Sequence, residues 1–438
     1  MSNKNRLIIS LCILSFTAIF ILIIVFVPQS NKETEKETIQ KKYNINTNIN
    51  TTDNNYIDNL IKDTSSKNEE QFINDINENN YDIETSSLDI SYNTEQLDKL
   101  YTIYYIENKK INNEETIKKE LKYYFNNEEI TLDKIYTDQE NFYTKLNWYI
   151  NWYINRESNT IEYTNKEAIK DPNNYYIIFN KSEILIQFKE NTLLNEETTI
   201  PCPYTALSTY LNKDIINMDA VDIKKIDNKD DEYYKTKKVV AFTFDDGPKA
   251  ANTNLLLDEL EKRNYKVTFF VVGYLADANR DVIKREYDLG HNVGTHTWAH
   301  KYLQQFKKDV EGMKESVISA DNVVADVTGQ PVKYFRPPGG IINETILNNI
   351  DHPFIMWSVD TRDWEKRDTE LDAIAAVTST KKTGDIVLFH DAHAPSIPGA
   401  IQAMDILSYD NFEFVNLDTL TRLQNITLED HKTYRAIR

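Results

Sequence analysis

Apolar and polar positions divide the chain into stretches of different character. The first is an apolar run at 7–27, which follows two basic residues and ends at Pro28. Its length is about the 20 residues that a helix needs to span a bilayer, so residues 1–28 are predicted to form a cytoplasmic tip and a transmembrane anchor. Residues 29–87 are rich in Asn, Thr, Lys, Glu and Asp. This composition predicts a disordered polar stalk.

The alternative to an anchor is a cleaved signal peptide. The apolar segment of a signal peptide usually has only ~7–15 residues, and no small-x-small cleavage motif follows this run. We therefore expect an uncleaved single-pass helix in the cell membrane, with the rest of the chain outside the cell. Within the stalk, short helical pieces are expected at 56–61 and 71–76.

Residues 88–216 contain more tyrosine and β-branched residues, which favour short strands. One segment, 114–125, is predicted as a helix because Ile117, Leu121 and Tyr124 recur at i, i+4 and i+7. The stretch as a whole is predicted to form a small α+β module.

A charged linker at 217–237 leads into a stretch of alternating strands and helices, 238–438. This alternation predicts parallel strands with crossover helices, which is an α/β fold. Strands are expected at 239–244, 267–272, 292–294, 333–336, 354–359, 386–389 and 412–415. Helices are expected at 254–263, 280–289, 310–327, 371–378 and 397–407.

Length and charge restrict what such a chain does. Its 438 residues exceed a typical domain, so two folded units plus linkers are expected. The formal net charge of −19 argues against a nucleic-acid partner, because Lys and Arg that neutralise phosphates supply most of that affinity. Of the two cysteines, Cys12 lies in the apolar run and Cys202 in the module, so no disulfide framework is expected.

Carboxylates and histidines follow several of the predicted strands. Asp245 and Asp246 come directly after the strand at 239–244. His296 and His300 are four apart, so on a helical turn both imidazoles would project from one face. Two imidazoles and one of the carboxylates suit Zn²⁺ with an open position for water, and the same set can hold Fe²⁺. The other carboxylate would accept a proton from that water, which is the chemistry of a hydrolase.

Other strand ends offer the remaining groups that a hydrolase needs. His390 ends the strand at 386–389, and a histidine suits proton donation near neutral pH. Arg336 is a fixed cation that can orient a carboxylate, and the backbone N–H groups beyond it can meet an oxyanion. The segment 359–364 contains a carboxylate that can form an ion pair with an imidazolium. It also contains Trp364, whose indole can line a pocket.

Five of these segments, in this order, resemble the motifs of polysaccharide deacetylases, the NodB-homology domain of carbohydrate esterase family 4. They are Thr-Phe-Asp-Asp-Gly-Pro at 243–248, His-Thr-Trp-Ala-His at 296–300, Arg-Pro-Pro-Gly-Gly at 336–340, Asp-Thr-Arg-Asp-Trp at 360–364 and Leu-Phe-His at 388–390. The resemblance extends from residue 238 to about residue 423. It implies a distorted (β/α)7-8 barrel with its active site at the carboxyl ends of the strands.

The resemblance also implies roles for individual residues. The general base is Asp245, the general acid is His390, and the metal ligands are Asp246, His296 and His300. Arg336 orients Asp245, and Asp363 tunes His390. The substrate-binding residues are Pro338, Gly339, Trp364 and Leu388. The implied metal is a divalent ion, Zn²⁺ in the first place, with Co²⁺ or Mn²⁺ as alternatives.

Gly339 departs from the family pattern, which usually has an aromatic residue after Arg-Pro-Pro. A glycine keeps the backbone N–H that the family uses for the oxyanion, but it removes the aromatic wall against the sugar. His291 and His393 match no ligand position, and we expect both to be structural or solvated.

The end of the middle stretch resembles the extracellular domain of RsiV-type anti-sigma factors. Strands are expected at 175–179 and 184–188, followed by a third that ends in Ile-Pro-x-x-Tyr at 200–204 and a short helix at 207–211. No cluster of His, Cys or acidic residues occurs there, so a binding or spacing role is expected.

Together these features predict an anchored, exported enzyme that removes N-acetyl groups from a cell-wall glycan and releases acetate. Tethering to the membrane favours peptidoglycan N-acetylglucosamine or N-acetylmuramic acid as the substrate. Chitin-type or poly-N-acetylglucosamine oligomers are the alternative. Two other classes remain open: a catalytically silent glycan-binding or envelope-sensing protein, and an iron-dependent oxygenase that uses the same ligands.

Overall fold

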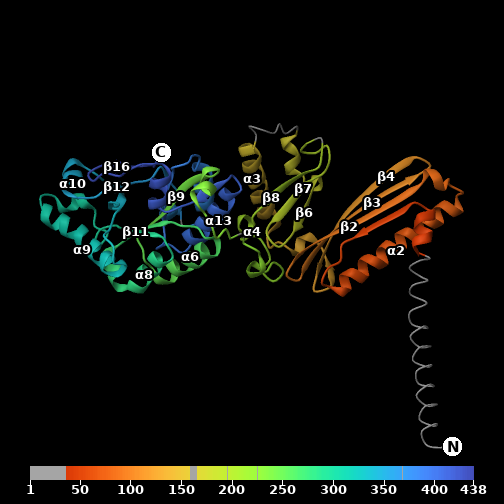
Figure 1. Cartoon of the computed structure of the whole chain (residues 1–438), viewed down its shortest axis with the longest axis horizontal. Helices are drawn as coiled ribbons and strands as arrows, with labels where there is room; N and C mark the ends of the chain where they lie inside the picture. Colours follow the sequence, from red (N-terminus) through yellow and green to blue (C-terminus); the bar gives the residue numbers. More distant parts are fainter. Residues whose placement is uncertain (1–35, 158–164, 195, 224, 367) are drawn as a thin grey trace, which may run out of the picture. The chain divides into compact units, whose positions relative to one another are not determined.

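The computed structural model describes residues 36–157, 165–194, 196–223, 225–366 and 368–438 (Figure 1). The predicted anchor at 7–27 lies outside them. Among the described residues, no helix combines the length and the apolar character needed to cross a membrane. Contacts divide the chain into two compact units, Met1–Ile135 with Asp214–Ile216 and Tyr136–Lys213 with Asn217–Arg438.

The first unit is a five-stranded sheet with one long helix against it. The strand order is β1-β2-β3-β4-β5, with β1 parallel to β2 and the other neighbours antiparallel. The elements are β1 Ile45–Ile49, α2 Asn55–Glu78, β2 Ser87–Leu97, β3 Leu100–Ile111, β4 Glu114–Phe125 and β5 Glu128–Ile130. The helix α2 buries Ile57, Ile61, Phe72 and Ile76 in one core with isoleucines and tyrosines of β1 to β4 (Figure 1).

Residues 36–87 are therefore not the disordered stalk that their composition predicts. Both predicted helical pieces, 56–61 and 71–76, lie within the single helix α2. A few apolar residues on one face are enough for this helix, because the sheet supplies the rest of the core. Asn54 caps its start, since the side chain accepts hydrogen bonds from the N–H groups of Tyr56 and Ile57.

The segment 114–125 is strand β4, so the predicted helix is wrong. Two-residue turns with positive φ flank it: Asn112 and Asn113 at 48° and 69°, and Asn126 and Asn127 at 51° and 68°. Such turns join antiparallel strands and match their twist. Opposite charges also face each other across the β3·β4 pair, as Glu107 and Lys118 do.

The second unit begins with a helix and a small antiparallel sheet, ordered β6-β7-β8. The elements are α3 Gln139–Glu157, β6 Tyr175–Phe179, β7 Ile184–Phe188, β8 Thr198–Cys202 and α4 Tyr204–Leu207. The three strands confirm the predicted order, whereas the short helix comes earlier than 207–211. The helix α3 was not predicted, although its buried Phe142, Leu146 and Tyr149 recur at i, i+4 and i+7. The module expected at 88–216 thus lies partly in each unit.

Parallel strands and crossover helices form the rest of the second unit. The sheet order is β11-β10-β9-β14-β13, and β15 also pairs with β9. The strands are β9 Lys238–Asp245, β10 Thr268–Val271, β11 Asn292–Thr295, β12 Phe354–Ile355, β13 Val359–Asp360, β14 Ile386–His390, β15 Phe412–Phe414 and β16 Thr433–Tyr434. The main helices are α6 Ala250–Arg263, α7 Gly273–Ala278, α8 Arg280–Asp288, α9 Val310–Thr328, α12 Thr369–Ser379 and α13 Ser396–Ser408.

The predicted α/β class is confirmed, with two local differences. The strand expected at 354–359 is divided into β12 and β13, and the strand expected at 333–336 is reduced to Phe335, which bridges to Thr295 and Phe354. These bridges extend the parallel order beyond β11 towards β12. Closure of the strands into a barrel stays a prediction.

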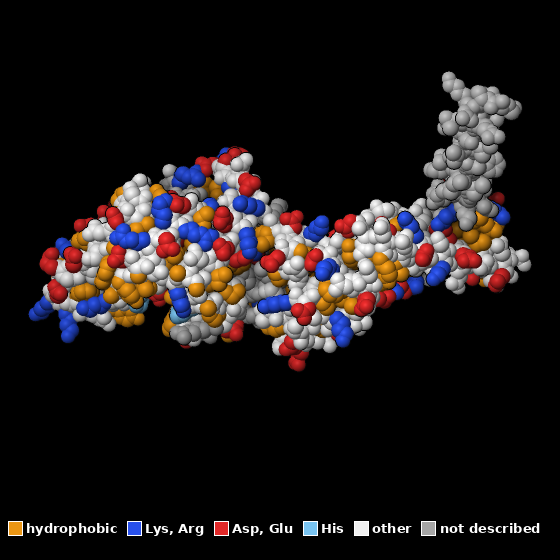
Figure 2. Space-filling view, turned by 90° about the horizontal axis from the view of Figure 1, so that it is seen from below, with side chains coloured by type: hydrophobic (Ala, Val, Ile, Leu, Met, Phe, Trp, Pro, Cys, Tyr) orange, Lys and Arg blue, Asp and Glu red, His pale blue; other side chains and the backbone are white. Residues whose placement is uncertain are grey.

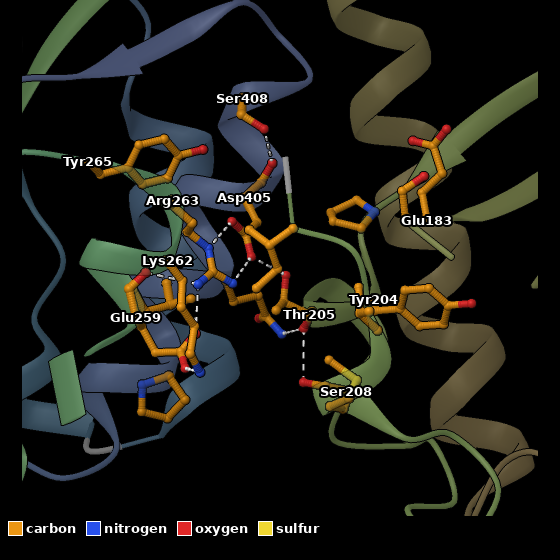
Figure 3. A pocket seen from close by; sticks show the side chains of 18 of the residues that line it. Glu183, Tyr204, Thr205, Ser208, Glu259, Lys262, Arg263, Tyr265, Asp405 and Ser408 are labelled. Carbon is orange, nitrogen blue, oxygen red and sulfur yellow. Dashed lines mark hydrogen bonds and ion pairs between the residues drawn. The ribbon is translucent and has the colours of Figure 1, made fainter. Parts of the chain in front are cut away.

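A buried ion network joins α4 to the parallel sheet's helices within the second unit (Figure 3). Arg263 on α6 is only 3% exposed and donates to both carboxylate oxygens of Asp405 on α13, at 2.7 and 2.9 Å. Asp405 also accepts from the Thr205 hydroxyl at 2.8 Å. A cavity of about 1120 Å³ lies beside this network. None of the predicted site residues lines it.

Acidic and basic side chains are intermixed over the face of the molecule drawn in Figure 2. Neither sign dominates that face, although the chain carries a formal net charge of −19.

Candidate active site

Asp245 and Asp246 stand at the carboxyl end of β9 and face different partners. The strand is apolar and buried, so it delivers the pair to the edge of the sheet. Asp245 is 2% exposed, and its Oδ1 accepts a hydrogen bond from Arg336 Nη1 at 2.7 Å. Asp246 has a φ of 72°, which turns the backbone away from the extended direction. Asp245 therefore pairs with Arg336 and Asp246 with His300, while both carboxylates lie within 3.8 Å of His296 Nε2.

His296 and His300 follow β11 and approach Asp246. The Asp246 Oδ1 lies 3.1 Å from His300 Nε2 and 3.6 Å from His296 Nε2. The expectation that the two histidines share a helical turn is wrong, because they lie in a loop with positive φ at Thr297 and His300, 66° and 52°. This bent backbone, and not the pitch of a helix, brings the ring centroids within 5.1 Å.

The donor set of this trio fits a divalent metal ion. One ligand atom from each residue lies within 4.8 Å of the others. His296 Nδ1 is 2.6 Å from the Arg336 carbonyl oxygen, so the proton on Nδ1 directs the lone pair of Nε2 towards the trio. Burial also lowers the pKa of His296, which favours the neutral imidazole that a metal requires. Two imidazoles and a carboxylate are typical of Zn²⁺ sites.

Asp246 and His300 shift each other's pKa. Burial alone would raise the pKa of Asp246, but the hydrogen bond from His300 and the electrostatic interactions with both histidines outweigh it and hold that pKa well below its usual range. The hydrogen bond with Asp246 raises the pKa of His300 in turn. Asp246 is therefore ionised at neutral pH and available as an anionic ligand.

Arg336 is completely buried and holds Asp245 through a fixed fork. Its Nε donates to the Ile355 carbonyl at 2.9 Å and its Nη2 to the Met356 carbonyl at 3.0 Å. Its Nη1 donates to both Asp245 and the Thr243 hydroxyl. Because each nitrogen has a partner, the guanidinium cannot rotate, and it fixes the orientation of the Asp245 carboxylate.

His390 stands beside Asp245, because β14 pairs in parallel with β9 and places these two residues opposite each other. The imidazole Nδ1 is 2.8 Å from Asp363 Oδ1, and the His390 backbone N–H donates to Asp363 Oδ2 at 2.7 Å. Burial would lower the pKa of His390, but the hydrogen bond and charge of Asp363 raise it to about 9. His390 is thus protonated at neutral pH and able to donate a proton.

The predicted substrate-binding residues lie around the same strand ends. Pro338 is buried, and Gly339 follows it with a φ of 66°. Leu388 is 3% exposed on β14, whereas Trp364 is 49% exposed, directly after Asp363. An exposed indole beside the site suits contact with substrate.

Two residues that the sequence analysis did not identify support the site. Asp391, directly after His390, is fully buried, hydrogen bonds with the Thr253 hydroxyl and lies against Gly247, where a Cβ would meet its oxygens at 2.3 Å. Burial raises the pKa of Asp391 to about 7. Tyr302 packs on His300 and is treated below. The only sequence signal for them was their position, one residue after His390 for Asp391 and two residues after His300 for Tyr302.

His291 and His393 do not belong to the group of possible ligands that the described residues contain. His291 is buried, and its Nδ1 accepts the Val267 backbone N–H at 3.1 Å, which confirms a structural role. The His393 ring lies 5.9 Å from the His390 ring.

An α/β sheet with a carboxylate pair, two histidines and a buried arginine at its strand ends defines a metal-dependent hydrolase site, and comparison identifies the family. The chain belongs to the polysaccharide deacetylase family: residues 232–352 match the family described as Polysaccharide deacetylase. A Bacillus cereus peptidoglycan-N-acetylglucosamine deacetylase is 32% identical over 194 residues, 41% of this chain and 69% of that protein.

Two further relatives extend the comparison. The peptidoglycan-N-acetylglucosamine deacetylase PgdA of Listeria monocytogenes is 37% identical over 186 residues, 42% of this chain and 39% of PgdA. The peptidoglycan-N-acetylmuramic acid deacetylase PdaC of Bacillus subtilis is 26% identical over 234 residues, 50% of each chain. The chain thus spans about two fifths to one half of the length of these two relatives.

Proposed function

We propose that the chain removes N-acetyl groups from peptidoglycan, at N-acetylglucosamine or N-acetylmuramic acid, and releases acetate. The observation that carries the proposal is the meeting of three groups at adjacent strand ends: the Asp245–Arg336 pair, the trio around Asp246, and the His390–Asp363 pair. This set offers a base, a metal site and an acid, which together suffice for metal-assisted hydrolysis of an amide. The named relatives act on the same glycan.

The residues of this chain divide the reaction between them. A divalent ion held by Asp246, His296 and His300, which we propose to be Zn²⁺, would supply Lewis-acid polarisation and a lowered pKa of water. Asp245, oriented by Arg336, accepts the proton of the water that attacks the acetamide carbon. The backbone N–H of Gly339 faces the oxyanion. His390 then donates a proton to the departing amine nitrogen, and Asp363 stabilises the imidazolium before that step.

We also propose a location for the enzyme, a closed form for its sheet and a role for the strands β6-β7-β8. The apolar run at 7–27 supports a membrane anchor with the enzyme outside the cell. The bridges through Phe335 support a distorted (β/α) barrel. The strand order β6-β7-β8, followed by α4, supports a similarity to the extracellular domain of RsiV-type anti-sigma factors. We propose that this part of the chain has a binding or a spacing role.

Acetate release from purified peptidoglycan by the zinc-loaded full chain tests this function. Mass spectrometry of the digested wall should show fragments lighter by one acetyl group, on glucosamine or on muramic acid. Asp245→Asn is the matched control, because it keeps the shape of the side chain and removes the base. Release of acetate only from chitin oligomers would favour the alternative substrate class, and no release from any glycan would refute the proposal.

A further inference from the structure

Tyr302 stands at the edge of the metal trio, two residues beyond His300. Its ring meets the His300 imidazole edge-on, with the centroids 5.8 Å apart and the planes at 64°. The residue is 36% exposed, so part of the ring faces solvent beside the site.

The same ring occupies the space next to Gly339. A Cβ built on Gly339 would lie 3.3 Å from Cε1 and 3.4 Å from Cζ of Tyr302. The φ of 66° at Gly339 also strains any other residue. The position beside the proposed oxyanion donor thus has little room for a side chain of its own, and an aromatic ring reaches it from another loop.

The loop that carries Tyr302 is anchored in the protein. Leu303, the next residue, is 2% exposed and packs in a cluster with Met313 and Phe335. The Tyr302 carbonyl accepts the Gln305 N–H at 2.9 Å. The backbone that carries the ring is therefore held in place before substrate arrives, which reduces the entropy lost on binding.

We propose that Tyr302 positions the substrate by packing its ring against a sugar of the bound glycan, beside the metal trio. An aromatic face is complementary to the C–H groups of a pyranose ring, and the location next to His300 and Gly339 puts that sugar where its acetamide reaches the site. Tyr302 is a positioning residue and touches no reacting atom. The inference rests on the proposed function, because it takes the ligand to be an N-acetylated glycan.

Steady-state kinetics on an N-acetylglucosamine pentamer test the role. Loss of an aromatic contact typically weakens binding ~2- to 10-fold, so Tyr302→Ala should raise KM by about fivefold and leave kcat within about twofold. Tyr302→Phe keeps the ring and should behave as the wild type. Tyr287→Ala, at a comparably exposed tyrosine (38%) on α8, is the control and should change neither constant.

Calorimetric titration of the same pentamer into zinc-loaded Asp245→Asn protein gives a readout that needs no turnover. In the double variant Asp245→Asn, Tyr302→Ala, the Kd for the pentamer should rise by the same factor as KM. Melting temperatures of the single and the double variant check that both are folded. An unchanged Kd overturns the inference, as does a Phe variant as weak as the Ala variant, or a fall in kcat at constant KM. Absence of acetate release by the wild type would instead refute the proposed function, and the titration would still decide the role of Tyr302.

Discussion

Replacing Asp363 with asparagine should lower the pKa of His390. The pair is buried, with His390 11% exposed and Asp363 0%, and two hydrogen bonds join the residues. A pKa raised from 6.5 to about 9 corresponds to ~3 kcal/mol of preferential stabilisation of the imidazolium. Burial lowers that pKa, whereas the charges of Asp245 and Asp246 still raise it, so the pKa of His390 in the variant should fall well below that of the wild type.

The pH dependence of stability follows from the same shift. Because the pKa of His390 is higher in the folded than in the unfolded chain, its protonation stabilises the fold. This contribution is complete below pH 6.5 and is lost as the pH rises through about 9. In Asp363→Asn that contribution should be smaller, and acetate release near neutral pH should fall because less His390 is protonated.

Histidine-selective carbon labelling and NMR titration of the metal-free protein would measure this pKa. The chain has seven histidines, and His390→Gln would assign the signal. Asp360→Asn is the matched control, since Asp360 is an exposed carboxylate that accepts the Arg362 N–H. A wild-type midpoint near 6.5, or a midpoint that Asp363→Asn does not move, would refute the reasoning.

Three further results are expected. His300→Ala should lose stoichiometric zinc by metal analysis, whereas Asp245→Asn should keep zinc and lose turnover; equal loss of metal in both would contradict the division of roles. Arg263→Ala leaves the Asp405 carboxylate, which is only 14% exposed, without its cation, so it should lower the free energy of unfolding by ~3 kcal/mol in urea titration. Phe72→Ala should cost ~3–5 kcal/mol in the first unit and expose α2 to proteolysis, and an unchanged protease pattern would argue against the α2 core.

The sequence was sufficient to predict which side chains meet at the site. Polar residues at the ends of apolar runs fall at one edge of a parallel sheet, and this rule places Asp245, His296, Arg336 and His390 correctly. The same rule could not predict the backbone conformation that brings these side chains together. The approach of His296 and His300 depends on left-handed backbone in a loop, and the contact of Tyr302 with Gly339 depends on tertiary packing.

The errors in the first unit have two different causes. The composition of 29–87 as a whole is polar, and it does not reveal that one face of α2 is apolar. One apolar residue per turn, or fewer, is enough to pack this helix against a tyrosine-rich sheet. In 114–125 three apolar residues at helical spacing outweighed the Asn-Asn pairs at either end, although those pairs are the stronger local signal for a hairpin. The missed helix α3 contains aromatic residues that were taken to favour strands.

The pairing of β9 with β14 sets the order in which the molecule can be assembled. In the first unit, β2, β3 and β4 each pair with the next strand along the chain, and such local contacts form early in folding. In contrast, the Thr243 hydroxyl bonds to the Val387 carbonyl, 144 residues away. A chain interrupted before β14 would carry Asp245, Asp246, His296 and His300 without the strand that bears His390, so the site residues are complete only when nearly the last strand has been made.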